Sequence, residues 1–177
     1  MSVLDRIERL RNVMEQQKID CYIIPTDDYH HSEYVGDYFK FREYITGFTG
    51  SAGTAVFTKD KAGLWTDGRY FLQAEEELST SCVELYKMGQ ENVPTTFEYI
   101  ENEVPSGSKV GFDGRTISAA MGAILELNLA KKNITISYED DLLNEIWEDR
   151  PALSDVKAFL LDIKYSGEDF TSKIARV

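Results

Sequence analysis

Apolar residues recur every three or four positions near the start of the chain. Ile7, Leu10 and Met14 would lie on one face of a helix. The preceding run Ser2-Val3-Leu4-Asp5 has the form of a capping box, in which two side chains satisfy backbone donors of the first helical turn. The pattern predicts a helix to about Gln17 that packs its apolar face on a sheet.

Short apolar runs separated by turn residues follow. The run Cys21–Ile24 ends at Pro25 and is typical of a strand buried on both faces. Two further runs, 54–57 and 62–65, flank the charged segment Lys59-Asp60-Lys61, which predicts a β-hairpin. By the same patterns we expect more strands at 82–86, 109–113 and 134–138, and helices at 68–78, 95–104, 118–130 and 140–147.

These elements predict an α/β protein. Strands and helices alternate along the chain, which favours a three-layer α/β/α sandwich with about six strands. The hairpin requires at least one antiparallel pair, so the sheet is expected to be mixed. The glycines at 47, 50 and 53 precede the hairpin and mark positions where the backbone needs a positive φ or a close approach to a neighbour.

The end of the chain differs from the rest. Arg150-Pro151 breaks the helical pattern, so we expect one domain at 1–152 and, at 153–177, a linker and the truncated start of a second domain. The segment 156–161 fits either a strand or a linker. Ser166-Gly167-Glu168-Asp169 has the form of a second capping box, and the amphipathic pattern behind it continues to Val177 without a stop signal. We therefore expect that the sequence is part of a longer protein.

Composition narrows the function classes. The 177 residues carry 19 Lys and Arg against 31 Asp and Glu, a net charge of −12, which argues against nucleic-acid binding because phosphate contacts need clustered cations. No apolar run approaches the length needed to span a bilayer, and no secretory signal opens the chain, so we expect no membrane partner and a cytoplasmic protein. Cys21 and Cys82 both lie in apolar runs and are expected to be buried, reduced thiols.

Two polar segments are candidates for chemistry but fit no catalytic motif. His30 and His31 stand among carboxylates, yet adjacent loop histidines point in different directions and no second ligand group follows, so a solvated or domain-contacting loop is favoured over a metal site. Ser51 lies in a Gly-Ser-Ala-Gly run, but it precedes a strand and both histidines come before it in the chain, unlike a hydrolase nucleophile. We expect no catalytic residue and no metal or cofactor site within these 177 residues.

The segment Asp67-Gly68-Arg69-Tyr70 is the more specific candidate. Asp67 is placed to cap the helix that follows, and Arg69 could present its planar guanidinium to a carboxylate of a substrate or a neighbouring subunit. The alternative is a simple helix cap beside a surface arginine.

Two motifs give the chain a recognisable resemblance. The run 44–55, Tyr-Ile-Thr-Gly-Phe-Thr-Gly-Ser-Ala-Gly-Thr-Ala, and the run 64–74, Leu-Trp-Thr-Asp-Gly-Arg-Tyr-Phe-Leu-Gln-Ala, resemble the N-terminal domain of Xaa-Pro aminopeptidases (aminopeptidase P) in the creatinase/prolidase group. Segments 26–34 and 146–151 resemble the family's flanking motifs, so the similarity covers nearly the whole chain.

The resemblance implies an enzyme that removes the N-terminal residue from peptides with proline second. In the family the chemistry belongs to a C-terminal pita-bread domain, where a metal pair, commonly Mn(II), activates water. The N-terminal domain shapes the cleft entrance and contributes to contacts in a homodimer. The positions matched to that role here are Asp67, Arg69, Tyr70, His30 and His31. Alternatives are a related superfamily member, either a creatinase-like amidinohydrolase or a non-catalytic binding module, and a free-standing α/β binding domain.

Overall fold

The computed structural model describes residues 1–139 and 141–177. The elements, in chain order, are α1 (Val3–Gln17), β1 (Cys21–Pro25), η1 (Asp37–Phe39), α2 (Phe41–Thr46), β2 (Thr54–Thr58), β3 (Ala62–Thr66), α3 (Phe71–Leu78), β4 (Glu84–Lys87), α4 (Thr96–Glu103), β5 (Lys109–Phe112), α5 (Ala119–Leu129), η2 (Ala130–Lys132), β6 (Thr135–Ser137), α6 (Leu143–Ile146), α7 (Ile163–Ser166) and α8 (Phe170–Arg176). None of the helices in these described ranges is long and apolar enough to cross a membrane.

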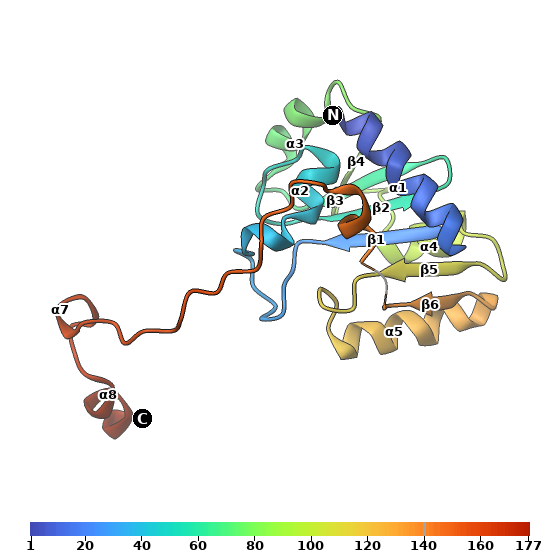
Figure 1. The fold of residues 1–177 in the computed structure, drawn as a ribbon. Coiled ribbons are helices and arrows are strands. Elements are labelled where there is room, and N and C mark those ends of the chain that lie inside the picture. Colours follow the sequence, from blue (N-terminus) through green and yellow to red (C-terminus); the bar gives the residue numbers. More distant parts are fainter. Residues whose placement is uncertain (140) are drawn as a thin grey trace.

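The six strands form one mixed sheet in the order β4-β3-β2-β1-β5-β6 (Figure 1). β2 pairs antiparallel with both β1 and β3, while the remaining pairs are parallel. The predicted hairpin is confirmed, with the Thr58 amide donating to the Lys61 carbonyl across the turn at 2.9 Å. The mixed, six-stranded sheet agrees with the sequence prediction.

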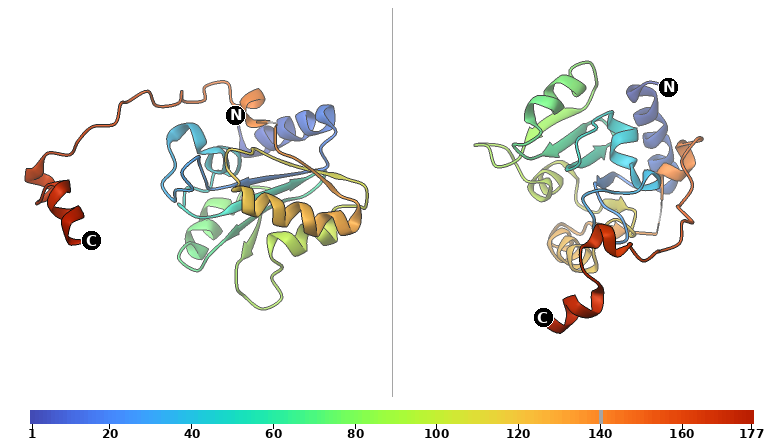
Figure 2. Two further views of the ribbon diagram at one scale, coloured as in Figure 1. Left: turned by 90° about the horizontal axis from the view of Figure 1, so that it is seen from below. Right: turned by 90° about the vertical axis from the view of Figure 1, so that its left-hand side faces the viewer.

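Helices cover both faces of the sheet, which makes three layers (Figure 2). Alternation along β1 shows why: Tyr22 and Ile24 enter the core under α1, α2, α3 and α6, whereas Cys21 and Ile23 enter the core under α4 and α5. Burial on both faces explains the continuous apolar run in this strand.

Helix starts largely follow the sequence signals. Ser2 caps α1 in a capping box with Asp5, and Thr95 caps α4 in a capping box with Glu98. Ser118 caps α5, its hydroxyl accepting from the Met121 amide.

Several elements differ from the prediction. The short helices η1 and α2 lie in a segment where aromatic residues fall on no clean period, because only one or two turns form and tertiary contacts bury Phe39, Phe41 and Ile45. The expected helix at 140–147 is reduced to Leu143–Ile146, with residue 140 outside the described residues. Cys82 is exposed, contrary to expectation, because β4 starts two residues later at Glu84.

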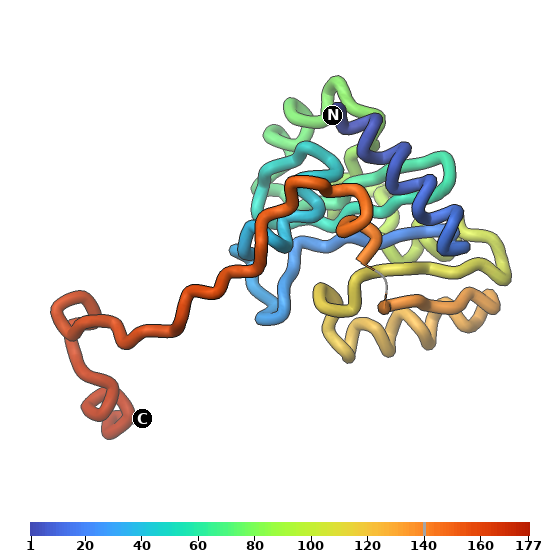
Figure 3. Tube along the Cα trace, viewed as in Figure 1, coloured from blue at the N-terminus to red at the C-terminus, as the bar shows by residue number. Residues whose placement is uncertain are grey.

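Residues 151–162 form an exposed, extended tail that leads to α7 and α8 (Figure 3). Of the two alternatives for 156–161, a linker is therefore the one observed. The predicted capping box at 166–169 is wrong: Ser166 ends α7, and Asp169 alone caps α8, accepting from the Ser172 amide at 3.0 Å. The domain division at 152 stays a prediction.

Candidate functional site

The candidate residues gather at one edge of the sheet because of its topology. All strands except β2 run parallel, so their carboxyl ends meet at this edge together with the amino end of β2. The loop 26–36 leaves β1 there, the glycine loop 47–53 enters β2 there, and Asp67 follows β3. The tail departs toward the same side, the left in Figure 1, to which the arrowheads of β1 and β5 point.

The carboxylate of Asp67 holds the guanidinium of Arg69. Arg69 donates from Nε to Asp67 Oδ1 and from Nη2 to Oδ2, each at 2.9 Å, and its amide donates to Oδ1 at 3.0 Å. The sequence predicted that Asp67 caps the next helix, and this prediction is wrong. That helix, α3, starts at Phe71, and its N-cap is Tyr70, whose side chain makes no capping hydrogen bond to the first turn. The carboxylate orients an arginine instead.

Glu33 extends this pair across the edge. Its Oε1 accepts from Arg69 Nη1 at 3.1 Å and from Ser51 Oγ at 2.8 Å, and Ser51 Oγ also lies 2.6 Å from the Tyr70 hydroxyl. We call Glu33, Ser51, Asp67, Arg69 and Tyr70 the Arg69 cluster.

Hydrogen bonds set the protonation states of the Arg69 cluster. The Ser51 hydrogen bond, and then that of Arg69, lower the pKa of Glu33, and the Arg69 hydrogen bond lowers the pKa of Asp67. Both carboxylates raise the pKa of Arg69. The cluster therefore holds two carboxylates and one guanidinium, all ionised near neutral pH.

The Arg69 cluster is open to solvent and borders two hollows. The side chain of Arg69 is 59% exposed, and those of Glu33 and Asp67 are 42% and 38% exposed. Glu33 and Ser51 line both hollows, of about 270 and 340 Å³. Ser51 Oγ hydrogen-bonds Glu33 and Tyr70, and no described hydrogen bond joins it to the histidine expected beside a serine nucleophile. The exposed, ionised side chains of the cluster can pair with a charged or polar group.

A buried arginine, unnoticed in the sequence, supports this edge from below. Arg42 is 4% exposed and donates to the Thr26 hydroxyl (2.7 Å), the Phe48 carbonyl (2.8 Å) and the Gly50 carbonyl. Burial lowers its pKa to about 10. Its three acceptors fix the glycine loop relative to β1. No pattern in the sequence predicts this, because Arg42 lies in a short helix that periodicity does not indicate.

Close packing explains the glycines of this loop. Gly47 has φ +79°, and a Cβ on Gly50 would come within 2.4 Å of the Phe48 ring and 2.7 Å of the Tyr70 ring. The expectation of positive φ or close approach is thus confirmed at Gly47 and Gly50.

His30 and His31 lie beside the cluster rather than in it. His31 Nδ1 contacts Asp27 Oδ2, and His31 borders the hollow that Asp67 also lines. His30 is largely exposed, with its Nδ1 3.6 Å from Asp28 Oδ1. Over residues 1–139 and 141–177, no three His, Cys, Asp or Glu side chains are grouped so as to hold a metal ion.

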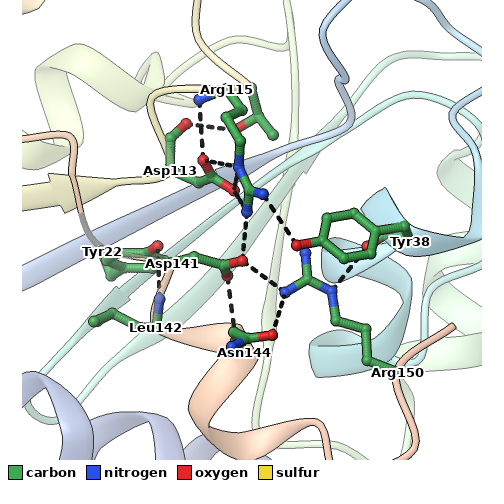
Figure 4. A network of polar contacts seen from close by, with 9 residues as sticks. Tyr22, Tyr38, Asp113, Arg115, Asp141, Leu142, Asn144 and Arg150 are labelled. Atoms are coloured by element: carbon green, nitrogen blue, oxygen red, sulfur yellow. Dashed lines mark hydrogen bonds and ion pairs between the residues drawn. The ribbon is translucent and has the colours of Figure 1, made fainter. Parts of the chain in front are cut away.

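A second Asp-Gly-Arg segment, Asp113-Gly114-Arg115, follows β5 and repeats the local geometry (Figure 4). Here the arginine is only 28% exposed and also contacts Asp141, which accepts from Arg150 Nη1 at 2.6 Å. Arg150 lies 3.5 Å from the centre of the Tyr38 ring. This network ties the domain's last residues to η1, whereas Arg69 remains open to solvent.

Comparison with known proteins agrees with this architecture. The family model for the Creatinase/Prolidase N-terminal domain matches residues 6–143, and the chain belongs to that family. It is 47% identical over 159 residues to aminopeptidase P2 of Arabidopsis thaliana. This alignment covers 88% of the chain and 22% of the plant protein.

The solved structures agree with that relationship. The X-prolyl aminopeptidase of Caenorhabditis elegans, described as a cytosolic enzyme with a di-nuclear active site, superposes with a TM-score of 0.87 and 30% identity over 99% of this chain and 30% of that one. An Xaa-Pro dipeptidase from Bacillus anthracis shares the fold at a TM-score of 0.59 and 19% identity, over 81% of this chain and 35% of its own. The resemblance to the N-terminal domain of Xaa-Pro aminopeptidases is confirmed, and the chain spans roughly a quarter of such relatives.

Proposed function

We propose that this chain is the non-catalytic N-terminal domain of a metal-dependent Xaa-Pro aminopeptidase, which releases the first residue of peptides with proline second. The observation that carries the proposal is the match of residues 6–143 to the Creatinase/Prolidase N-terminal domain, together with the alignment of 99% of the chain to 30% of the worm enzyme. A related superfamily member, either a creatinase-like amidinohydrolase or a binding module, is the alternative.

The metal chemistry belongs, in this proposal, to residues downstream of Val177. The Arg69 cluster does not fit a di-nuclear site, because a guanidinium occupies its centre and its carboxylates are engaged by Arg69 and Ser51. We therefore derive no catalytic step within this domain. The parent enzyme would carry two divalent ions, with Mn(II) as the proposed metal.

The domain's own contribution is a wall of the substrate cleft. Arg69 is oriented by Asp67 yet largely exposed, so it can meet a carboxylate of a peptide or of a neighbouring subunit without reorganising. The tail leaves the domain at the same edge, and its side chains Val156, Phe159 and Leu160 are 79 to 89% exposed. Their burial against a downstream domain would bring that domain to the side of the sheet that carries the Arg69 cluster.

The assembly and location follow the same reasoning. We propose a homodimer of the full-length protein in the cytoplasm, in line with the description of the worm enzyme as cytosolic. His30 and His31, on the loop beside the cluster, are the further candidates for cleft or subunit contacts.

Cleavage assays with and without the downstream residues test the proposal. We expect the full-length protein with Mn(II) to cleave an Xaa-Pro peptide and to leave the matched Xaa-Ala peptide intact, while the 177-residue chain cleaves neither. Mn(II)-dependent cleavage by the 177-residue chain alone would contradict the division of labour. Release of urea from creatine by the full-length protein, without peptide cleavage, would support the amidinohydrolase alternative instead.

A further inference from the structure

Four cationic side chains surround one hollow at the edge of the sheet opposite the Arg69 cluster. Arg11 lies on α1, Lys18 caps that helix, Lys59 is in the β2–β3 turn, and Lys109 starts β5. Together they line a hollow of about 710 Å³, larger than the two beside the Arg69 cluster. We call it the cationic hollow.

The topology brings these residues together from distant parts of the sequence. β1, β5 and β6 run parallel, so their amino ends lie side by side at the right of Figure 1. Asp20 directly precedes β1, Lys109 is the first residue of β5, and Thr135 is the first residue of β6. Antiparallel β2 brings its carboxyl end and the adjoining Lys59 to the same edge.

The four cations have no ionic partners in the described part of the chain. No carboxylate oxygen of the described residues lies within 4.0 Å of any of them. Cations elsewhere on the surface commonly do have one, as in the pairs Arg9–Glu148, Lys61–Glu103 and Lys87–Glu75. The chain has 31 acidic residues and only 19 basic ones, so a hollow lined by four cations without ionic partners is not what its composition would lead one to expect.

Arg11 is already oriented for a ligand. Its Nε donates to the Thr58 carbonyl at 3.1 Å, which fixes the half-buried side chain, and neither Nη1 nor Nη2 donates to another described residue. A planar guanidinium with two free nitrogens matches an oxyanion in a bidentate manner.

Two carboxylates, those of Glu15 and Asp20, also border the cationic hollow and neutralise only part of its positive charge. Asp20 Oδ2 accepts from the Lys109 amide at 2.8 Å, so one of its oxygens is occupied by the backbone. Glu15 is exposed at the rim. Four cations therefore face two carboxylates, and an anion that enters the hollow meets a net positive field.

We propose that the cationic hollow is a binding site for a small multivalent oxyanion, with phosphate or carboxylate groups. The Arg11 guanidinium binds one oxyanion group, and Lys18, Lys59 and Lys109 neutralise the remaining charge as point charges. The site is independent of the proposed peptidase function, because it lies at the far edge of the sheet from the Arg69 cluster.

Titration of the 177-residue chain with pyrophosphate and, separately, with citrate tests the proposal by ¹H–¹⁵N NMR. We expect saturable shifts confined to the amides around residues 11–20, 58–61 and 107–110 for at least one anion, weakening as NaCl is raised because the charges are exposed. The anion that binds more tightly shows whether the natural ligand carries phosphate or carboxylate groups.

A matched pair of double variants separates a site from a general charge effect. Lys18→Gln with Lys59→Gln should weaken binding about fivefold to tenfold, whereas Lys131→Gln with Lys157→Gln, which removes the same charge elsewhere, should leave it unchanged. Arg11→Lys, which retains the charge but not the bidentate geometry, should also weaken it. Shifts that do not saturate with either anion, or equal weakening in both double variants, would overturn the proposal.

Discussion

The guanidinium of Arg69 is held two residues away by the carboxylate of Asp67, through two side-chain hydrogen bonds of 2.9 Å and a third from the Arg69 amide. The pair is formed within a single turn, so its geometry depends little on the rest of the fold. The same local unit recurs at Asp113 and Arg115, where additional carboxylate and aromatic neighbours make it part of the interior network. The Asp67–Arg69 unit therefore differs from the Asp113–Arg115 unit because its oriented arginine is exposed to solvent.

Removing the buried arginine should destabilise the domain strongly. Arg42→Met leaves the Thr26 hydroxyl and the Phe48 and Gly50 carbonyls without their donor, so we expect a loss of about 2–4 kcal/mol in the free energy of unfolding. Arg9→Met removes an exposed ion pair with Glu148 and should cost less than about 1 kcal/mol. Urea denaturation of both variants measures the difference, and equal losses would contradict the role assigned to Arg42.

Adding one methyl group should have opposite effects at two glycines. In Gly50→Ala the Cβ would lie 2.4 Å from the Phe48 ring, so we expect destabilisation by about 1–3 kcal/mol. In Gly122→Ala, within α5, the Cβ meets nothing within 4 Å, and the better helix propensity should stabilise by about 0.5–1 kcal/mol. Thermal unfolding of the two variants checks the sign of each change.

Acid should weaken the domain partly through Glu33. Its pKa is lowered in the folded state, so the unfolded state binds more protons as pH falls, and the stabilisation present above about pH 4.3 is lost as pH falls through the folded-state pKa. Glu33→Gln should therefore lose less stability on acidification than the unchanged chain. Glu8→Gln, at an exposed position on α1, is the control, and an identical acid response of the two variants would contradict the ionic role of Glu33.

The two thiols should differ in reactivity. Cys21 is fully buried and burial raises its pKa, whereas Cys82 is exposed. We expect a thiol reagent to modify one cysteine rapidly in the native chain and the second only on unfolding. Cys82→Ser should abolish the rapid reaction, and rapid labelling that persists in that variant would show Cys21 to be accessible.

The sequence predicted the layers of the fold well because its signals were local. Capping boxes, apolar runs and the charged hairpin turn each depend on a few neighbouring residues. The structure confirms the capping box at Ser2 and the hairpin turn at Thr58–Lys61, whereas the capping box expected at 166–169 is wrong. The short helix α2 was missed because tertiary burial, not periodicity, stabilises six residues.

The site was predicted less completely for the same reason. Asp67 and Arg69 stand out as a motif, but Glu33 reaches Arg69 across 36 positions and Ser51 reaches Glu33 across 18. Asp67 was misassigned as a cap because an aspartate before a helix has two uses, and only the structure shows that its oxygens bind Arg69. Arg42 gave no signal, since its acceptors are mostly backbone carbonyls.

Kinetics of the full-length protein test whether Arg69 lines the cleft of an Xaa-Pro aminopeptidase, as proposed above. We expect Arg69→Ala to cost less than about 1 kcal/mol of stability, because its ion pairs are exposed. We expect it to lower kcat/KM for an Xaa-Pro peptide, or to weaken subunit association, by about tenfold or more, since hydrogen bonds to charged groups contribute about 1.5–3 kcal/mol. Arg9→Ala, which also removes one exposed cation, should change neither quantity. Unchanged turnover and unchanged association in Arg69→Ala would contradict the claim and leave Arg69 as a surface partner of Asp67.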